Sequence, residues 1–420
     1  MSGYLTPLTL ETEHIEDGPL SWVTLERVLA AAAMVCVGSR ENIISGFTLG
    51  HVVAIALTPL WLPHLARFRG GALTFGLGLV TAIFGLLLSL HTAQTHAVNP
   101  TGRHFQTALL LGSLFSIGVI LWARAHLRLS TVAVCYGLGM LASAVHHGSF
   151  SADNPWKSGF AVPVSVVLLA LALRRTTFAP QMFAILLLAG VSAASGSRSY
   201  TATFVLGAVL LAWQRRPTHM SRRASWVWSG FGLVALSVAV YNVIASFLVE
   251  GLLGEAAQAK SVAQIDTGGS LILGGRPEIA ATLALMKHHF MGYGVGIKAS
   301  TDDLAVAKSA MLGINYDPDN GYVNTYMFGG PMELHSVIGD LWVNWGLMGL
   351  IFAMVALISV IHSFTQRIAH RNASALLIFL SVWTFWNYLF SPLYSAIPSL
   401  VLAVALVLPR RGDSFQSSWD

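Results

Sequence analysis

Charged side chains are scarce in this chain. Only 10% of its 420 residues are Asp, Glu, Lys or Arg, whereas 55% are hydrophobic. A soluble domain carries roughly a quarter charged residues, so this composition leaves too few polar groups to cover a surface in water and predicts a membrane protein. The formal net charge of +5 then follows from membrane topology. We therefore expect membrane lipid, and no nucleic acid, among its partners.

Cysteine is also scarce. The chain has two cysteines, Cys36 and Cys135, and both fall inside apolar segments. A thiol in such a segment is typical of a small buried side chain. The cysteines therefore predict neither a disulfide nor a metal site.

Apolar runs long enough to cross about 30 Å of hydrocarbon recur along the chain. They predict an all-α polytopic membrane protein with about twelve transmembrane helices. One connection, between the ninth and tenth helices, is as long as a small domain. The helices are expected near 20–38, 44–62, 72–91, 104–122, 130–147, 158–174, 180–195, 197–213, 224–248, 336–362, 374–389 and 393–409.

Basic residues alternate between the two sides of this predicted bundle. With the N-terminus in the cytoplasm, the inner connections and the adjoining helix ends hold most of the arginines, as the positive-inside rule requires. We therefore predict that both termini are cytoplasmic. The short outer connections hold only Arg40, Arg103, Lys157 and Arg198. The inner arginines are Arg67, Arg69, Arg124, Arg128, Arg174, Arg175, Arg215, Arg216, Arg222, Arg223, Arg367, Arg371, Arg410 and Arg411.

This topology divides the chain into three parts. Residues 1–248 hold transmembrane helices one to nine. Residues 249–335 form one large loop on the outer face. Residues 336–420 hold the last three helices and a cytoplasmic tail.

Two short amphipathic helices are expected in the outer loop. The first opens at Arg276-Pro277-Glu278, because Pro suits the first helical position and Glu the positive helix start. The second covers 301–312, with Ser300 and Thr301 as candidate caps and Asp302 and Asp303 in its first turn. The apolar stripe of the first helix is predicted at Ile279, Leu283, Met286 and Phe290.

Three residues stand at predicted outer helix starts: Arg198, Arg276 and His335. Helix N-termini present unpaired N–H groups and partial positive charge, which suit phosphate. An arginine adds a planar fork that matches two phosphate oxygens. Histidine is the side chain suited to moving a proton near neutral pH. Two such arginines close in space would hold a diphosphate, with His335 beside them for proton transfer.

Each of these residues also has a plainer interpretation. Arg198 suits an interfacial anchor, Arg276 a solvated helix start, and His335 a membrane boundary with its hydrogen bonds satisfied. Asp340 lies one to two turns inside the tenth helix. An intramembrane acid is a functional candidate, but a structural hydrogen bond to a neighbouring helix explains Asp340 equally well.

Two acidic pairs, Asp302-Asp303 and Asp317-Pro318-Asp319, resemble the paired acids that hold a divalent metal in many glycosyltransferases. The first pair fits helix capping and the second fits a turn, and we favour these structural roles. Adjacent histidines such as His288-His289 diverge by about 100° around a helix and form no chelating face. We therefore expect no metal and no other cofactor.

Several segments together resemble the O-antigen ligase and polymerase (Wzy-like) family of bacterial membrane glycosyltransferases. One of the late spans begins with Ser197-Arg198-Ser199. The large outer loop that follows contains a helix that begins with Arg276-Pro277-Glu278. The stretch HFMGYGVG (289–296), which includes Tyr293, is similar to the family's glycine-rich stretch, with Met291 where the family often has Pro. HSVIGDLW (335–342) running into WGLMGL (345–350) resembles the family's histidine segment.

The resemblance implies a GT-C-type transferase of the bacterial inner membrane that works at the outer face. Such proteins take a glycan from undecaprenyl diphosphate, the donor, and attach it to an acceptor hydroxyl of a glycan or lipid-linked glycan, with inversion and without a metal. Arg198 and Arg276 would bind the diphosphate, and His335 would act as base or orient the acceptor. Asp340, Tyr293 and Glu278 are further candidates for the same site.

A polymerase and a ligase differ in the acceptor that they use. No residue in the sequence indicates this acceptor, so both activities remain open. Two other classes compete with the transferase. A flippase or transporter for lipid-linked oligosaccharide fits twelve spans equally well, although such transporters usually show repeats and midplane charges that are not evident here. A structural scaffold for an assembly complex is the third class, and it would tolerate replacement of Arg276 and His335.

Overall fold

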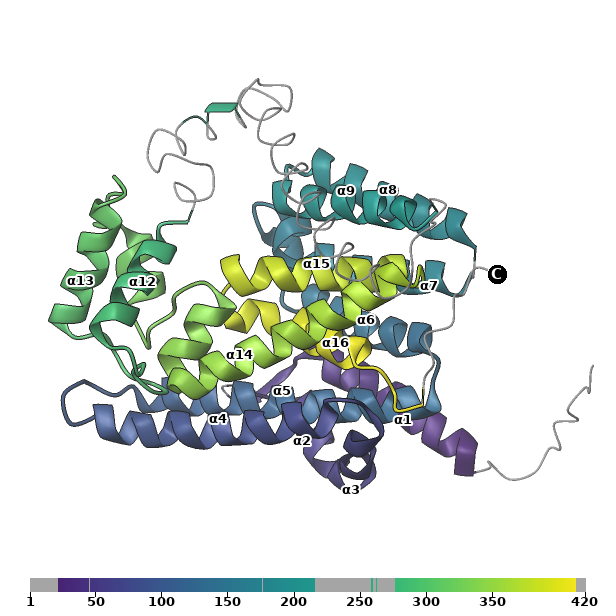
Figure 1. Ribbon diagram of the computed structural model, residues 1–420, viewed down its shortest axis with the longest axis horizontal. Helices are drawn as coiled ribbons and strands as arrows, with labels where there is room; N and C mark the ends of the chain where they lie inside the picture. The colour runs from purple at the N-terminus through teal and green to yellow at the C-terminus, as the bar shows by residue number, and fades with distance from the viewer. Residues whose placement is uncertain are drawn as a thin grey trace, which may run out of the picture.

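The computed structural model describes residues 22–412 apart from 45, 176, 216–257, 260–261 and 263–275. In these residues the architecture is all-α, as the sequence predicts, with one small antiparallel hairpin of β1 (Asn42–Ile44) and β2 (Phe47–Thr48). Figure 1 shows most of the helices running roughly alongside one another in one elongated bundle, with α12 and α13 grouped at one end.

The helices follow the predicted apolar runs in order, and short 3₁₀ or π segments η1 to η4 join some of them. The first group is α1 (Trp22–Ser39), α2 (Leu49–Ala56), α3 (Thr58–Trp61), η1 (Leu62–Arg67), α4 (Gly71–Thr92), α5 (Pro100–His126), α6 (Leu129–His146), η2 (Ser149–Ser151), η3 (Trp156–Phe160), α7 (Ala161–Leu173), α8 (Phe178–Ala194) and α9 (Arg198–Trp213). The second group is α12 (Glu278–His288), α13 (Thr301–Leu312), η4 (Tyr322–Met327), α14 (Val337–Ala369), α15 (Ala375–Phe390) and α16 (Leu393–Val407).

Within the described residues, five helices are long and apolar enough to cross a membrane, or six if one bent pair counts as a single span. Helices α8, α15 and α16 are shorter and also apolar. This set of helices suits a multi-pass membrane protein. The predicted ninth span, 224–248, lies outside the described residues.

The predicted second span, 44–62, is not one helix. It begins with the β-hairpin, and the helical part bends by 59° between α2 and the segment Thr58–Arg67. Pro59 has no N–H to continue the hydrogen bonds of α2, and the Trp61 indole N–H instead donates to the Ala54 carbonyl across the break (2.7 Å). The prediction of a continuous helix was therefore wrong at this proline.

Helix α14 extends past the predicted span 336–362 and is interrupted at Gly346, whose φ of 63° and ψ of −152° are not helical. A left-handed φ of this kind favours glycine. A side chain at Gly346 would also collide with the Met291 carbonyl and the Phe84 ring. The break therefore lets the chain after α12 approach α14 closely.

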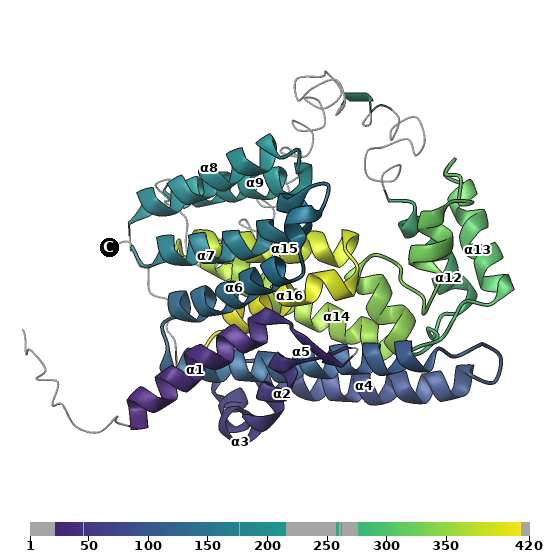
Figure 2. The same ribbon diagram turned by 180° about the vertical axis from the view of Figure 1, so that it is seen from behind.

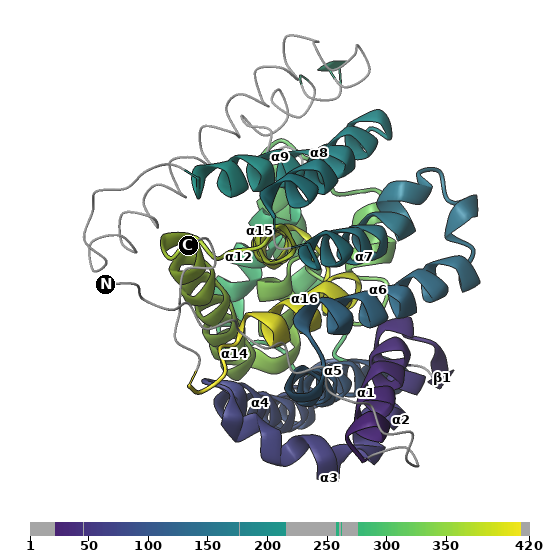
Figure 3. The same ribbon diagram turned by 90° about the vertical axis from the view of Figure 1, so that its right-hand side faces the viewer.

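Helices α15 and α16 form the centre of the bundle. Figure 3 shows them between α8 and α9 on one side and α4 and α5 on the other. Side chains of α16 are buried continuously from Pro398 to Val407. Two stacked ring pairs join α9 to α15: Tyr200 on Trp383 (4.2 Å between centroids) and Phe204 on Phe379 (5.0 Å). Their order shows that α9 and α15 run antiparallel.

Large apolar side chains on the outside of the bundle follow helical spacing. A stripe of such residues faces outward on α4 and another on α14, and water would penalise both. Lipid is the solvent that these faces suit. The stripe on α4 is Leu73, Val80, Ile83, Leu87 and Leu90, and that on α14 is Ile351, Met354, Ile358 and Ile361.

Connections predicted to be cytoplasmic meet at one end of the bundle. The backbone N–H of Arg69 donates to the Pro409 carbonyl (2.9 Å), and the Arg124 guanidinium donates to the Leu408 carbonyl (2.8 Å). The connections 63–71 and 123–129 and the chain after α16 therefore share a face, as the alternation of arginines predicts.

At the other end, α12 and α13 form a small module (residues 276–334) that docks on α4, α5 and α14, as Figure 2 also shows from behind. The backbone N–H groups of Tyr293 and Gly294 donate to the Val343 carbonyl (2.9 and 3.0 Å), and the Ser89 hydroxyl donates to the Val295 carbonyl (2.7 Å). The glycine-rich stretch 292–296 is thus the strip of backbone that lies against the bundle.

The buried face of α12 differs from the predicted stripe. Glu278, Ala281, Thr282 and Leu285 are buried, whereas Leu283 and Phe290 of the predicted stripe are 55% and 66% exposed. The helix packs closely against α13, so its small residues face inward. The large apolar residues are left at the surface of the module.

Gly294 should be essential for docking of the module. Its φ is +100°, and a Cβ there would collide with the Ser89 backbone, so Gly294→Ala should lower the free energy of unfolding by at least about 2 kcal/mol. Gly76→Ala is the matched control on α4, because open space surrounds Gly76. Thermal unfolding of the purified chain in detergent should show a lower midpoint only for Gly294→Ala. Equal midpoints for the two variants would contradict this docking geometry.

Candidate functional site

Arg276 and Glu278 form an ion pair where α12 begins. The Arg276 Nη1 and Glu278 Oε1 atoms are 3.3 Å apart, and the Arg276 side chain is 32% exposed while that of Glu278 is 1% exposed. Burial raises the pKa of Glu278, although the positive charge of Arg276 opposes this rise. The buried carboxylate thus contacts one side of the guanidinium and leaves part of it open to solvent.

Aromatic rings of α15 lie beside the same guanidinium. The Cζ atom of Arg276 is 5.5 Å from the centre of the Phe390 ring and 5.9 Å from that of Trp386. A guanidinium at this distance from a ring face is attracted to it. The end of α15 therefore fixes the position of Arg276 relative to the apolar bundle.

Tyr322 joins this pair to His335. It starts η4, and burial together with the negative charge of the nearby Glu278 carboxylate raises its pKa. The Tyr322 and His335 rings are 5.1 Å apart. Arg276, Glu278, Tyr322 and His335 therefore form one cluster, which we call the Arg276–His335 cluster.

His335 occupies an unusual backbone conformation, with φ of +53°. Such a conformation in a residue other than glycine is sparsely populated and is often found at functional sites. Nδ1 of His335 is buried and has no hydrogen-bond partner among the described residues. This nitrogen is thus held inside the protein with its hydrogen-bonding capacity unused.

The electrostatic surroundings favour a neutral His335 ring. Burial lowers its pKa, a hydrogen bond to the Glu333 carbonyl raises it, and the charge of Arg276 lowers it further, with a net lowering below 6.5. A neutral imidazole keeps a lone pair on one of its two ring nitrogens. The arrangement can therefore accept a proton at neutral pH.

Arg198 opens α9, two residues before Tyr200, whose ring stacks on Trp383. Because α9 and α15 are antiparallel, the start of α9 reaches the level of Trp386 on α15, whose ring lies near Arg276. The structure thus brings Arg276 and His335 into one cluster and places Arg198 on a neighbouring helix at a similar level.

Asp340 has a structural arrangement. Its carboxylate is buried and accepts hydrogen bonds from the backbone N–H of Leu334 (2.6 Å) and from that of Leu393 at the start of α16 (2.8 Å). Of the two interpretations offered by the sequence, the bond to a neighbouring helix is the one that the geometry supports. The carboxylate lies in the first turn of α14, before the Gly346 break.

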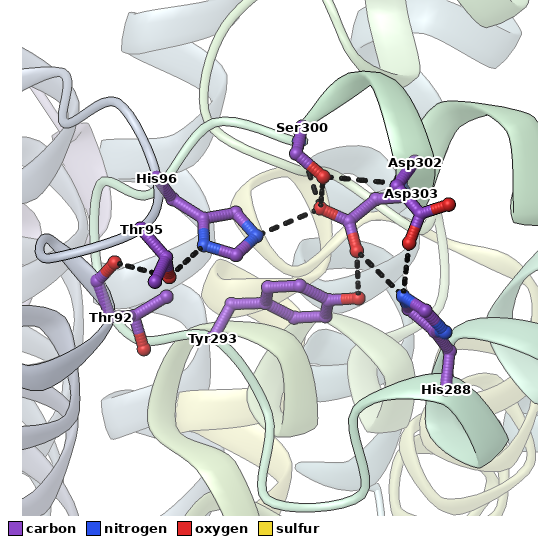
Figure 4. A network of polar contacts seen from close by, with 8 residues as sticks. All are labelled: Thr92, Thr95, His96, His288, Tyr293, Ser300, Asp302 and Asp303. Atoms are coloured by element: carbon purple, nitrogen blue, oxygen red, sulfur yellow. Dashed lines mark hydrogen bonds and ion pairs between the residues drawn. The ribbon is translucent and has the colours of Figure 1, made fainter.

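A second polar network lies in the module, around Asp303 (Figure 4). Asp303 accepts hydrogen bonds from the hydroxyl of Tyr293 (2.7 Å) and the hydroxyl of Ser300 (2.6 Å), and its Oδ2 lies 3.0 Å from Nε2 of His96 in the α4–α5 connection. Burial alone would raise the pKa of Asp303, but these hydrogen bonds produce a net lowering. The carboxylate therefore links α13 to the bundle, and Tyr293 belongs to this network rather than to the Arg276–His335 cluster.

The acidic pairs adopt the structural roles that the sequence favoured. Ser300 and Asp303 form a capping box at the start of α13. Asp317 accepts from the Asp319 backbone in a turn (2.9 Å), and Lys308 pairs with Asp319 (2.7 Å). In the described part of the chain, no group of three or more His, Cys, Asp or Glu side chains is arranged to hold a metal ion.

Sequence reasoning did not identify Tyr322, Trp386 or Phe390. Tyr322 lies in a stretch rich in Gly, Asn and Asp that reads as loop, and the two aromatic residues read as ordinary residues of an apolar span. Only the fold brings α12, η4 and the end of α15 together, so no spacing in the sequence could have indicated these neighbours.

Comparison of the chain with protein-family models, with curated proteins and with solved structures finds no match.

The adjacent residues Asp303 and Asp302 offer a matched test of the Figure 4 network. Asp303→Ala leaves buried donors unpaired and should cost roughly 3 kcal/mol of stability. The side chain of Asp302 is 76% exposed, so Asp302→Ala should change stability by less than about 0.5 kcal/mol. Because the pKa of Asp303 is lowered from 3.8, its contribution should be intact at neutral pH and be lost only as the pH falls below that value. Thermal unfolding at pH 7 and at several pH values below 3.8 measures both effects. Equal destabilisation by the two variants would contradict this assignment.

Proposed function

We propose that this chain is a GT-C-type glycosyltransferase that transfers a glycan from an undecaprenyl-diphosphate-linked donor to an acceptor hydroxyl at the outer face of a bacterial inner membrane. The observation that carries the proposal is the meeting of Arg276 and His335. These residues come from separate segments that the sequence suggests for phosphate binding and for proton transfer. In the fold they belong to one cluster with Glu278 and Tyr322. The resemblance to the O-antigen ligase and polymerase family assigns the same two roles.

Arg276 supplies the charge for the donor diphosphate. Its guanidinium is partly exposed and is fixed by Glu278 and by the α15 rings. A fixed planar fork binds two phosphate oxygens at a small entropic cost. In the transfer, the bond between the sugar carbon and the diphosphate breaks, and the leaving oxygens keep the electron pair. Arg276, together with Arg198, stabilises that charge in the place where other glycosyltransferases use a metal.

His335 receives the proton of the acceptor hydroxyl. As the acceptor oxygen forms its bond to the sugar carbon on the face opposite the diphosphate, its proton passes to the unprotonated nitrogen of the neutral ring. Burial and the charge of Arg276 lower the pKa of His335, which keeps this lone pair available at pH 7. The displacement inverts the sugar carbon and needs no other base.

The topology that we propose has twelve spans and both termini in the cytoplasm. It is supported by the meeting of the arginine-bearing connections at one end of the bundle and by the position of the module at the other. The lipid-linked donor would enter sideways from the outer leaflet, so that its glycan lies under the module.

The test of the arginine role is Arg276→Lys. Lysine keeps the charge but not the fork, so transfer by the purified protein should fall nearly as far as in Arg276→Ala, on the order of 100-fold or more. Lys287→Ala is the control, because Lys287 is an exposed cation on the same helix and its loss should leave the rate unchanged. The measurement is the rate of product formation from a lipid-diphosphate glycan.

Full activity of Arg276→Lys would exclude the diphosphate role. Chelation provides a second arm of the same assay, since EDTA should leave the wild-type rate unchanged. A strong loss that Mg²⁺ restores would instead assign metal binding to the acidic pairs at Asp302-Asp303 and Asp317-Asp319.

The pH profile tests His335. Because its pKa is lowered from 6.5, the neutral ring persists through neutrality, and the rate should fall only as the pH drops below 6.5. Removal of a general base typically costs a factor of about 100 to 10,000, so His335→Ala should lose the activity and also the acid limb. A rate that instead rises as the pH falls through 6.5 would show that the protonated ring is required.

A further inference from the structure

An open groove runs along the outside of the bundle between α2, α4 and α5. Its volume is about 720 Å³, which lies within the range of roughly 300–1,000 Å³ that small-molecule sites occupy. The walls are apolar: Ile55 of α2, Leu86 and Leu90 of α4, and Leu111 and Phe115 of α5 line it. None of the residues in the Arg276–His335 cluster lines this groove, and the inference that follows does not rest on the proposed function.

One end of the groove is polar and basic. Arg103 and His104, in the first turns of α5, line the groove together with Thr107. No acidic side chain lines the groove, and no described carboxylate forms an ion pair with Arg103. The groove therefore combines a cationic mouth with an apolar wall.

The length of the groove matches one leaflet of a bilayer. From Arg103 to Phe115 the α5 axis rises about 18 Å at 1.5 Å per residue, and half of the hydrocarbon core is about 15 Å. The backbone next to Arg103 meets the glycine-rich strip at Gly296, so the mouth lies at the end of the bundle that carries the module. Helices α4 and α5 are both long and apolar enough to span a membrane.

We propose that this groove binds one anionic phospholipid of the surrounding bilayer, with an acyl chain along α4 and α5 and the phosphate on Arg103 and His104. The charge at the mouth selects this occupant. A zwitterionic lipid brings its own cation to the phosphate and would leave Arg103 less well paired, and the apolar face of a second protein copy would bring no charge to it.

Lipid titration of the purified, delipidated full chain tests the proposal, with bound lipid counted by native mass spectrometry. The probes are phosphatidylglycerol and phosphatidylcholine with the same acyl chains. The wild type should bind one phosphatidylglycerol at least about fivefold more tightly than phosphatidylcholine, which is the effect of one interfacial cation worth about 1 kcal/mol. Arg103→Gln/His104→Gln should abolish this preference. Lys157→Ala, another basic residue in a predicted outer connection, should retain it.

A groove-filling variant separates the chain-binding part from the headgroup. Ala108 also lines the groove, so Ala108→Trp should lower the binding of both lipids while the thermal midpoint in detergent stays near that of the wild type. Equal binding of the two lipids by the wild type would overturn the proposal. A phosphatidylglycerol preference that survives Arg103→Gln/His104→Gln would also overturn it, as would full displacement of the lipid by soluble glycerol phosphate. A homodimer that dissociates in the Ala108→Trp variant would overturn it as well.

Discussion

The candidate site depends on the two hydrogen bonds that the Asp340 carboxylate accepts. The carboxylate accepts the backbone N–H of Leu334 and that of Leu393, and so joins the end of the module to the turn between α15 and α16. His335 directly follows Leu334, and Phe390 lies three residues before Leu393. One buried acid therefore fixes the distance between the imidazole and the aromatic rings beside which Arg276 lies. Its two acceptor oxygens satisfy donors that would otherwise be buried without a partner.

The module is attached mainly through its own backbone. Gly294 and Gly296 approach α4 and α5 so closely that a Cβ would collide at either position, and Val343 receives two N–H groups from the strip. The Asp303 network adds one polar link, through His96, between α13 and the α4–α5 connection. These two attachments hold α12, and with it Arg276, over the end of an otherwise apolar bundle.

The sequence predicted those features that depend on local chemistry. Apolar runs located most helices, the arginines separated the two ends of the bundle, and Ser300 and Asp303 were recognised as a helix cap. The sequence did not predict the features that depend on tertiary contacts. The break before Pro59 depends on how Trp61 bonds across it, and the buried face of α12 depends on what α13 presents to it.

The site itself was predicted only in part. Arg276 and His335 could be selected because an arginine and a histidine at predicted outer helix starts have a distinct chemistry. Glu278 was assigned to the helix start and named as a further candidate for the site, but nothing in the sequence indicates that it would be buried as the partner of Arg276. Tyr322 and the α15 rings carry no motif, because their role follows from proximity that only the folded chain creates.

The central claim is that the Arg276–His335 cluster performs glycan transfer at the outer face. The most direct measurement is complementation of the source organism deleted for this gene, by the wild type and by Arg198→Ala, Arg276→Ala and His335→Ala. Expression controls, surface-glycan gels and the location of lipid-linked precursor complete it. The account predicts that each variant is made normally while the glycan is lost and precursor accumulates outside. Normal glycan in the variants, or precursor that accumulates inside, would contradict it.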